Sequence, residues 1–138
     1  MAKHGYDVGQ ALPEIVRTVT AEVMYSRQWA GTNPVHSDPK SAARQGMKAP
    51  VVTGQLSAAY IQEACVAFFG EAMWRGSVMD VSFKRPVYLG DTLTAGGRVE
   101  SVSPEGGRRR VVVAAWARNQ KGEEVTTVRA EAVVVGSA

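Results

Sequence analysis

Residues 29–70 read WAGTNPVHSDPKSAARQGMKAPVVTGQLSAAYIQEACVAFFG, and the rest of the chain is organised around this stretch. Asn33-Pro34 favours a turn, because proline fixes its own φ and disfavours α geometry at the preceding residue. Asp38-Pro39 then predicts the start of a short helix, with the carboxylate as N-cap and proline at the first helical position. The stretch therefore begins with a polar turn that leads into a helix.

A second, longer helix is predicted from Thr53 to Gly70, with Thr53 as its N-cap. Its interior is apolar nearly all round, the exceptions being Ser57, Gln62 and Glu63. A helix of this kind is buried instead of lying on a surface. Gly54, at its start, leaves backbone N–H groups uncovered at the positive end of the helix dipole, which suits an acceptor that gains negative charge. The alternative is that Gly54 is only a packing or turn glycine.

The remaining chain is predicted to form mainly short β-strands separated by turns. The expected strands are residues 15–20, 78–83, 92–102, 110–117 and 125–135, with a helix over 21–29. The last three strands are joined by turns, including one over 104–107, and predict an antiparallel meander. The pattern indicates one α+β domain over residues 1–138, with the long helix on a curved antiparallel sheet. Residues 111–116 are apolar on both strand faces, which suggests that a partner subunit covers the second face.

Composition excludes several classes of function. The chain has 138 residues, 45% hydrophobic and 21% charged, as in an ordinary globular protein. Its net charge of +3 is small and its only basic run is Arg108–Arg110, so we expect no nucleic-acid partner. No apolar run approaches a membrane span or a signal peptide, and the single cysteine, Cys65, can form no disulfide within the chain. We expect a cytoplasmic protein without membrane contact, metal or cofactor.

His36 is the only histidine outside the N-terminal tail. Imidazole is the side chain whose ordinary pKa lies nearest neutral pH, so His36 is a candidate catalytic base. A loop histidine that forms only local hydrogen bonds would give the same pattern, and the residues alone leave both interpretations open.

Three segments together carry a family resemblance: residues 33–38 (NPVHSD), 49–56 (APVVTGQL) and 83–93 (FKRPVYLGDTL). In this order they resemble the MaoC-like family of (R)-specific enoyl-CoA hydratases and dehydratases, over nearly the whole chain. The resemblance implies a hot-dog fold, in which a curved sheet wraps around a central helix. It also implies a homodimer or a dimer-based oligomer, with an acyl-CoA thioester bound in a tunnel at the subunit boundary.

The resemblance further implies which residues act, and where this chain departs from the family. His36 matches the family's catalytic histidine, Asn33 its asparagine, and Gly54 the glycine whose amide receives the thioester carbonyl. The family's aspartate falls on Gly31, and the histidine before its helix glycine falls on Thr53. We expect Gly31, Thr53 and Tyr60 to contact substrate.

Without the aspartate, His36 must recycle the proton or use another carboxylate. Glu63 is a candidate for that carboxylate. Asp38 is better explained as a helix cap. Three functions therefore remain open. The first is a hydratase or dehydratase with an altered acid/base set. The second is a non-catalytic acyl-thioester-binding or structural subunit, and the third is a hot-dog acyl-CoA thioesterase. For the CoA phosphates, Lys84, Arg85 and Arg108–Arg110 are candidates.

Overall fold

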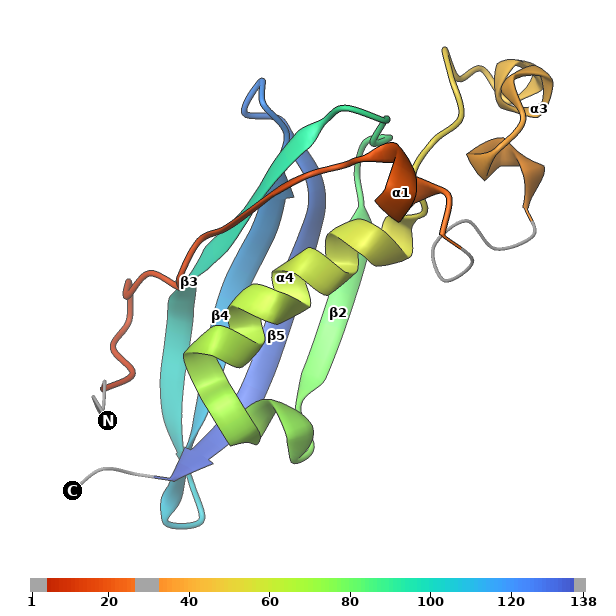
Figure 1. Cartoon of the computed structure of the whole chain (residues 1–138). Coiled ribbons are helices and arrows are strands. Elements are labelled where there is room, and N and C mark those ends of the chain that lie inside the picture. Colours follow the sequence, from red (N-terminus) through yellow and green to blue (C-terminus); the bar gives the residue numbers. More distant parts are fainter. Residues whose placement is uncertain (1–4, 27–32, 136–138) are drawn as a thin grey trace.

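The computed structural model describes residues 5–26 and 33–135, and Figure 1 shows the arrangement of the elements. In chain order these are β1 (Ile15–Thr18), α1 (Ala21–Met24), the 3-10 turn η1 (Pro34–His36), α3 (Pro39–Arg44), α4 (Gly54–Phe69), the 3-10 turn η2 (Gly70–Trp74), β2 (Val78–Phe83), β3 (Thr92–Glu105), β4 (Arg108–Arg118) and β5 (Glu124–Val135). The expected order of helices and strands is confirmed.

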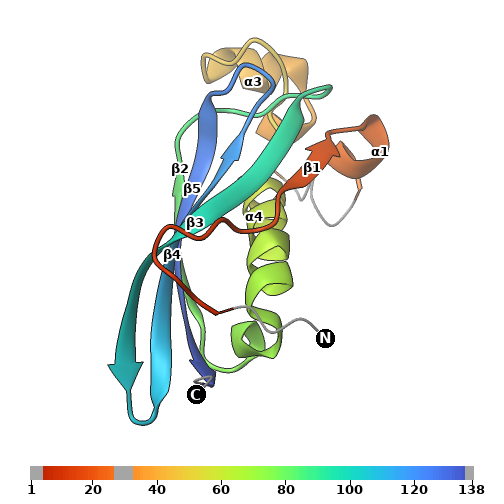
Figure 2. The same ribbon diagram turned by 90° about the vertical axis from the view of Figure 1, so that its left-hand side faces the viewer.

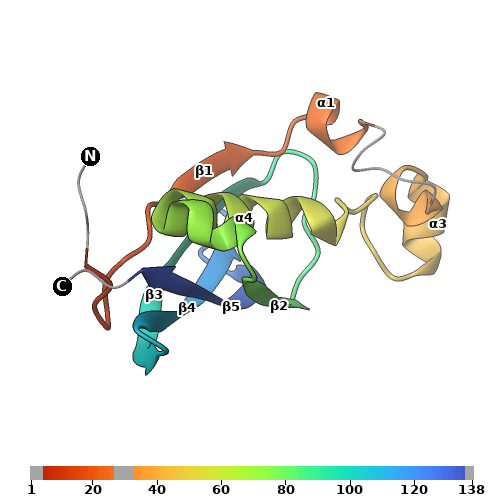
Figure 3. The same cartoon turned by 90° about the horizontal axis from the view of Figure 1, so that it is seen from below.

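The five strands form one antiparallel sheet in the order β1-β3-β4-β5-β2. β3, β4 and β5 are the predicted meander, and β1 and β2 occupy the two edges. The sheet is curved and α4 lies along its concave face, as Figures 2 and 3 show. The chain therefore has the α+β architecture that its sequence predicts.

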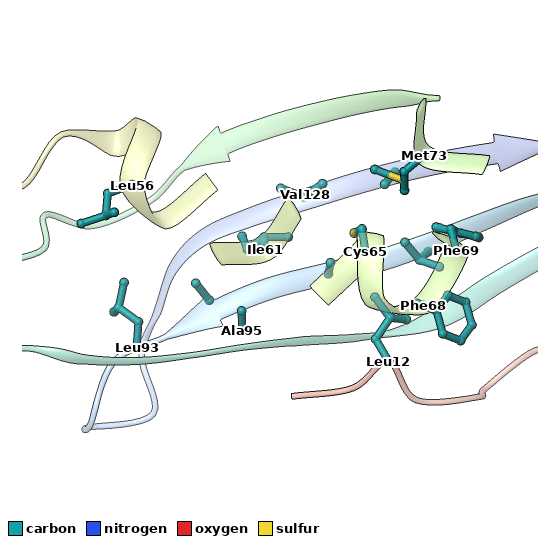
Figure 4. Packing of buried hydrophobic residues seen from close by; sticks show 14 of the residues in the cluster. Leu12, Leu56, Ile61, Cys65, Phe68, Phe69, Met73, Leu93, Ala95 and Val128 are labelled. Carbon is teal, nitrogen blue, oxygen red and sulfur yellow. The ribbon is translucent and has the colours of Figure 1, made fainter. Parts of the chain in front are cut away.

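The core lies between α4 and the sheet. Helix residues Leu56, Ile61, Cys65 and Phe68 face Leu93, Ala95 and Val128 of the strands, and all are nearly or fully buried (Figure 4). Burying one large aliphatic or aromatic side chain contributes about 1.5–3 kcal/mol. The apolar character of α4 is thus explained by its packing.

The β3–β4 turn is shorter than predicted. β3 continues through Pro104 and Glu105, and only Gly106 and Gly107 connect it to β4. Both glycines have positive φ, 55° and 81°, which matches the twist of a two-residue hairpin. The expectation of a turn over residues 104–107 was therefore wrong by two residues.

The predicted helix over 21–29 begins where expected, because the Thr20 hydroxyl accepts a hydrogen bond from Val23 N. The helix ends at Met24, and the last part of the predicted range lies outside the described residues.

Some apolar residues on the convex face of the sheet are covered by the chain's own side chains. Val112, which alternates with the core residues Val111 and Val113, is only 4% exposed. Trp116 lies between the guanidinium groups of Arg98 and Arg118, 5.9 and 4.3 Å from the ring centroid. The apolar residues on this face therefore give no independent evidence for a partner subunit.

Candidate active site

A cavity of about 480 Å³ lies at the N-terminal end of α4. Three separate segments form its wall: His36 with Met47, residues 51–55 and 57, and residues 83–87 at the end of β2. Thr126 of β5 completes the lining. The three segments that carry the family resemblance thus meet around one space.

His36 is held in a defined orientation. The Asn33 side chain accepts a hydrogen bond from Val35 N at 3.1 Å and caps η1, at whose end His36 lies. His36 Nδ1 lies 2.7 Å from the carbonyl oxygen of Val51. Because a carbonyl oxygen can only accept, Nδ1 carries the proton, and in the neutral ring Nε2 is then the basic nitrogen. Asn33, predicted as a catalytic residue, caps the turn that carries His36 and is not among the residues that line the cavity.

The first turn of α4 is left without a side-chain cap. Thr53 occupies the predicted N-cap position, but its hydroxyl accepts no hydrogen bond from the first turn. In the part of the chain that the structure describes, the amides of Gly54 and Gln55 have no acceptor. Both residues line the cavity, so the positive end of a 16-residue helix opens onto it.

Gly54 also has a packing role. A Cβ atom at this position would lie 2.6 Å from the Phe83 ring, which is itself 60% exposed at the edge of the sheet. The packing and the oxyanion interpretations of Gly54 are therefore compatible, because the same absence of a side chain admits the ring and leaves the amide uncovered.

Two buried hydroxyls in the cavity wall were not predicted as site residues. Ser57 and Thr126 are 2% and 0% exposed, and their oxygens lie 2.7 Å apart. Ser57 also donates to the carbonyl oxygen of Gly54 at 3.0 Å. The signal in the sequence was Ser57, one of three polar residues in the interior of an otherwise apolar helix.

Tyr60 does not line this cavity. It lies on another side of α4, where burial raises the pKa of its phenol and the nearby Arg17 opposes that shift. Glu63, one turn further, forms an ion pair with Arg17 at 2.5 Å and is also absent from the cavity wall. Gly31, the position of the family's aspartate, lies outside the described residues.

Asp38 is the N-cap of α3, as predicted. It accepts hydrogen bonds from the backbone of Lys40 and from both the amide and the hydroxyl of Ser41. The Ser41 hydroxyl is the main cause of the lowered pKa of this carboxyl. No aspartate or glutamate among residues 5–26 and 33–135 lines the cavity, so the described chain supplies no carboxylate partner for His36.

Of the basic residues, Lys84 and Arg85 line the cavity. Arg109 instead lies over the Tyr6 ring, which packs against Phe68 and Phe69 at the other end of α4. Within the described residues there is no group of histidine, cysteine and acidic side chains that could hold a metal ion, and no helix long and apolar enough to cross a membrane.

Comparison with known proteins identifies the family of this chain. The model of the MaoC-like domain matches residues 7–132. The chain belongs to the MaoC-like domain family. It is 32% identical over 100 residues to an (R)-specific enoyl-CoA hydratase of Aeromonas caviae, covering 69% of this chain and 72% of the relative.

Solved structures show the same hot-dog fold. The unliganded R-hydratase PhaJ1 of Pseudomonas aeruginosa is 28% identical, with a TM-score of 0.74 over 95% of this chain and 83% of that one. A chain of the ChsH1-ChsH2 complex of Mycobacterium tuberculosis is 24% identical, with a TM-score of 0.75 over 93% of this chain and 98% of that one. The second likeness concerns the fold alone.

Proposed function

We propose that this protein is a hydro-lyase that interconverts an enoyl-CoA and a 3-hydroxyacyl-CoA. One observation carries the proposal: His36, whose Nδ1 is bonded to the Val51 carbonyl, and the uncapped first turn of α4 line the same cavity. Hydration of a conjugated thioester needs a base for water and a stabiliser for the developing oxyanion. This cavity supplies one of each.

In the hydration direction, His36 Nε2 takes a proton from water while the water oxygen adds to C3 of the enoyl group. The electron pair of the double bond moves toward the thioester oxygen, which accepts a hydrogen bond from the Gly54 amide. The imidazolium then returns its proton to C2, so that H and OH have been added and the histidine is regenerated. His36 thus performs both proton transfers, because no carboxylate of the described residues lines the cavity.

The cavity wall also suits the rest of the substrate. Met47, Val52 and Val87 provide an apolar surface for a short acyl chain, and Lys84 and Arg85 provide positive charge for the CoA phosphates. Gly31 and Thr53 are proposed to contact the substrate, whereas Tyr60, for which the same contact was expected, lies away from this cavity.

A homodimer, or an oligomer built from dimers, completes the proposal. The edge strand β2 has unpaired backbone groups on one side and exposes Val81 and Phe83, which suits pairing with a second copy. A heteromer is the alternative, since the similar structure from Mycobacterium tuberculosis is a complex of ChsH1 and ChsH2. In such an assembly this chain would bind acyl thioester without turning it over.

The test is incubation of the purified protein with crotonyl-CoA. A hydro-lyase forms 3-hydroxybutyryl-CoA and leaves the thioester intact. Release of free CoA thiol would instead support a thioesterase, in which the Gly54 amide stabilises a tetrahedral oxyanion. Binding of crotonyl-CoA without either product would support the subunit interpretation and refute the proposal.

A further inference from the structure

Ser57 and Thr126 connect two elements that are 69 residues apart in the sequence. Ser57 lies in the first turn of α4 and Thr126 on β5, and both hydroxyls are buried in the cavity wall. A buried hydroxyl without a hydrogen bond is costly, so the direction of each bond in the pair can be worked out.

The Ser57 hydroxyl has one proton, and the carbonyl of Gly54 can only accept. When Ser57 donates to Gly54, Thr126 must donate to Ser57. The bonds then run in one direction, from Thr126 through Ser57 to the backbone of Gly54. The sheet is thereby linked to the same residue whose amide opens onto the cavity.

This link lies where the helix otherwise has little local support. Thr53 provides no side-chain cap, and a glycine at the first helical position has more backbone freedom than any other residue. Phe83 contacts this glycine, but its ring is 60% exposed and can turn. Besides the backbone hydrogen bond from Leu56 N to the Thr53 carbonyl, the pair of hydroxyls is therefore a buried polar contact that holds the first turn in place.

Burial alone would not require hydroxyls at these positions. Replacing both partners of a buried hydrogen bond by apolar groups of similar shape is often nearly neutral for stability. What the apolar replacement removes is the directional contact to Gly54. An effect on the reaction without a matching effect on folding would therefore separate positioning from packing.

We propose that Ser57, held by Thr126, is a positioning residue that fixes the peptide between Gly54 and Gln55, and through it the backbone of Gly54, whose amide is directed at the thioester oxygen. This inference rests on the proposed function, and it adds a hydrogen-bonded connection from Thr126 of β5 to the proposed oxyanion site. Errors of about 1 Å in such a site lower the rate by about a hundredfold, and smaller errors have smaller effects.

The experiment compares Thr126→Val, Thr126→Ser and Ser57→Ala in the full chain. We expect Thr126→Val and Ser57→Ala to lower kcat for crotonyl-CoA hydration by about tenfold or more with KM nearly unchanged, because the amide acts mainly in the transition state. Thr126→Ser keeps the hydroxyl and should retain most of the activity. The double variant should lose no more than Ser57→Ala alone, because Thr126 acts on Gly54 only through Ser57.

A matched control exists at another hydroxyl pair. Thr18 and Thr92 lie 2.9 Å apart on β1 and β3, in an exposed position. Thr18→Val removes an equivalent contact and should leave kcat unchanged. Wild-type kcat in folded Thr126→Val and Ser57→Ala, or a loss expressed only in KM, would overturn the inference.

A second measurement does not depend on turnover. Butyryl-CoA, which has no double bond to hydrate, should shift the Gly54 amide signal in ¹H–¹⁵N spectra of the wild type. Thr126→Val should reduce that shift at saturating ligand, and Thr126→Ser should restore it. An unmoved Gly54 signal in the wild type, or an equal shift in Thr126→Val, contradicts the positioning role. A normal shift with no hydration of crotonyl-CoA contradicts only the hydro-lyase.

Discussion

The two ends of α4 differ in what surrounds them. At the N-terminal end, Gly54 and Gln55 of the uncapped first turn line a cavity, and two buried hydroxyls support the turn. At the C-terminal end, Phe68 packs edge-on against Phe69, with ring centroids 5.1 Å apart, in the hydrophobic core. The C-terminal end of α4 is closed by apolar contacts, whereas the N-terminal end has polar groups beside a cavity.

A glycine lies at each end for a different reason. Gly70, the C-cap, has φ 61° and ψ −133°, and a Cβ atom there would meet nothing within 4 Å. Gly54 has no such backbone restriction, but its Cβ atom would lie 2.6 Å from Phe83. Gly70 is favoured by the backbone conformation at its position, and Gly54 by its close packing against Phe83 beside the site. We infer that the C-terminal end of α4 mainly stabilises the fold, and the N-terminal end mainly serves the chemistry.

The largest difference between the ends should appear on truncating an aromatic ring. Phe68→Ala should lower the free energy of unfolding by about 3–5 kcal/mol, because it leaves a cavity in the core. Phe83→Ala is the matched control at the open end, and its exposed ring should change this quantity by less than about 1 kcal/mol. Urea denaturation of both variants gives the comparison. Equal losses of unfolding free energy in the two variants would show that the two ends of α4 contribute equally to stability.

The two glycines provide a second contrast. Gly70→Ala should lower the free energy of unfolding by about 1–3 kcal/mol, since alanine is strained in this backbone conformation, and hydration activity should persist. Gly54→Ala should change stability by less than about 1 kcal/mol, because gained helix propensity offsets displacement of the Phe83 ring. Its kcat should fall. Denaturation and steady-state kinetics on both variants test these expectations. A kcat loss in Gly70→Ala alone would contradict the inference that the N-terminal end of α4 serves the chemistry.

A carboxylate at the position of the family's aspartate should raise hydration activity. Gly31→Asp restores the residue type that the family resemblance implies, and we expect hydration to rise about tenfold, which requires about 1.4 kcal/mol of transition-state stabilisation. The gain should vanish in the double variant Gly31→Asp/His36→Ala. A folded Gly31→Asp protein that binds acyl-CoA without any gain would favour the binding-subunit or thioesterase function.

The smallest effect is expected on the exposed side of α4, between its ends. Arg17→Ala breaks the half-exposed ion pair with Glu63 and should lower the free energy of unfolding by only about 0.2–1 kcal/mol. Glu63→Gln should leave hydration unchanged, because Glu63 does not line the cavity. Loss of hydration in Glu63→Gln would identify it as the missing carboxylate partner.

Much of the fold could be predicted from local sequence patterns. The all-round apolar helix and the alternating strands specify a buried helix on an antiparallel sheet, and the bounds of β2 were predicted correctly. The two-residue turn at Gly106-Gly107 was missed because Pro104 suggested an earlier break. The cover of Trp116 by Arg98 and Arg118 was missed because it depends on neighbouring strands.

The site was less predictable. His36 and Gly54 carry recognisable local signals, and the structure places both at the cavity. The contact of His36 with the Val51 carbonyl and the link from Ser57 to Thr126 join residues that only the folded chain brings together. Tyr60 lies on the same helix as Gly54, yet its position around the helix directs it elsewhere.

The central claim is that His36 acts as the base in a hydro-lyase site at the open end of α4. The most direct test is the kcat of the wild type and of His36→Ala for hydration of crotonyl-CoA, with unfolding measured on the same samples. The account predicts hydration by the wild type, a loss of about a hundredfold or more in His36→Ala, and a change in unfolding free energy of less than about 1 kcal/mol. Hydration by folded His36→Ala at the wild-type rate would contradict it.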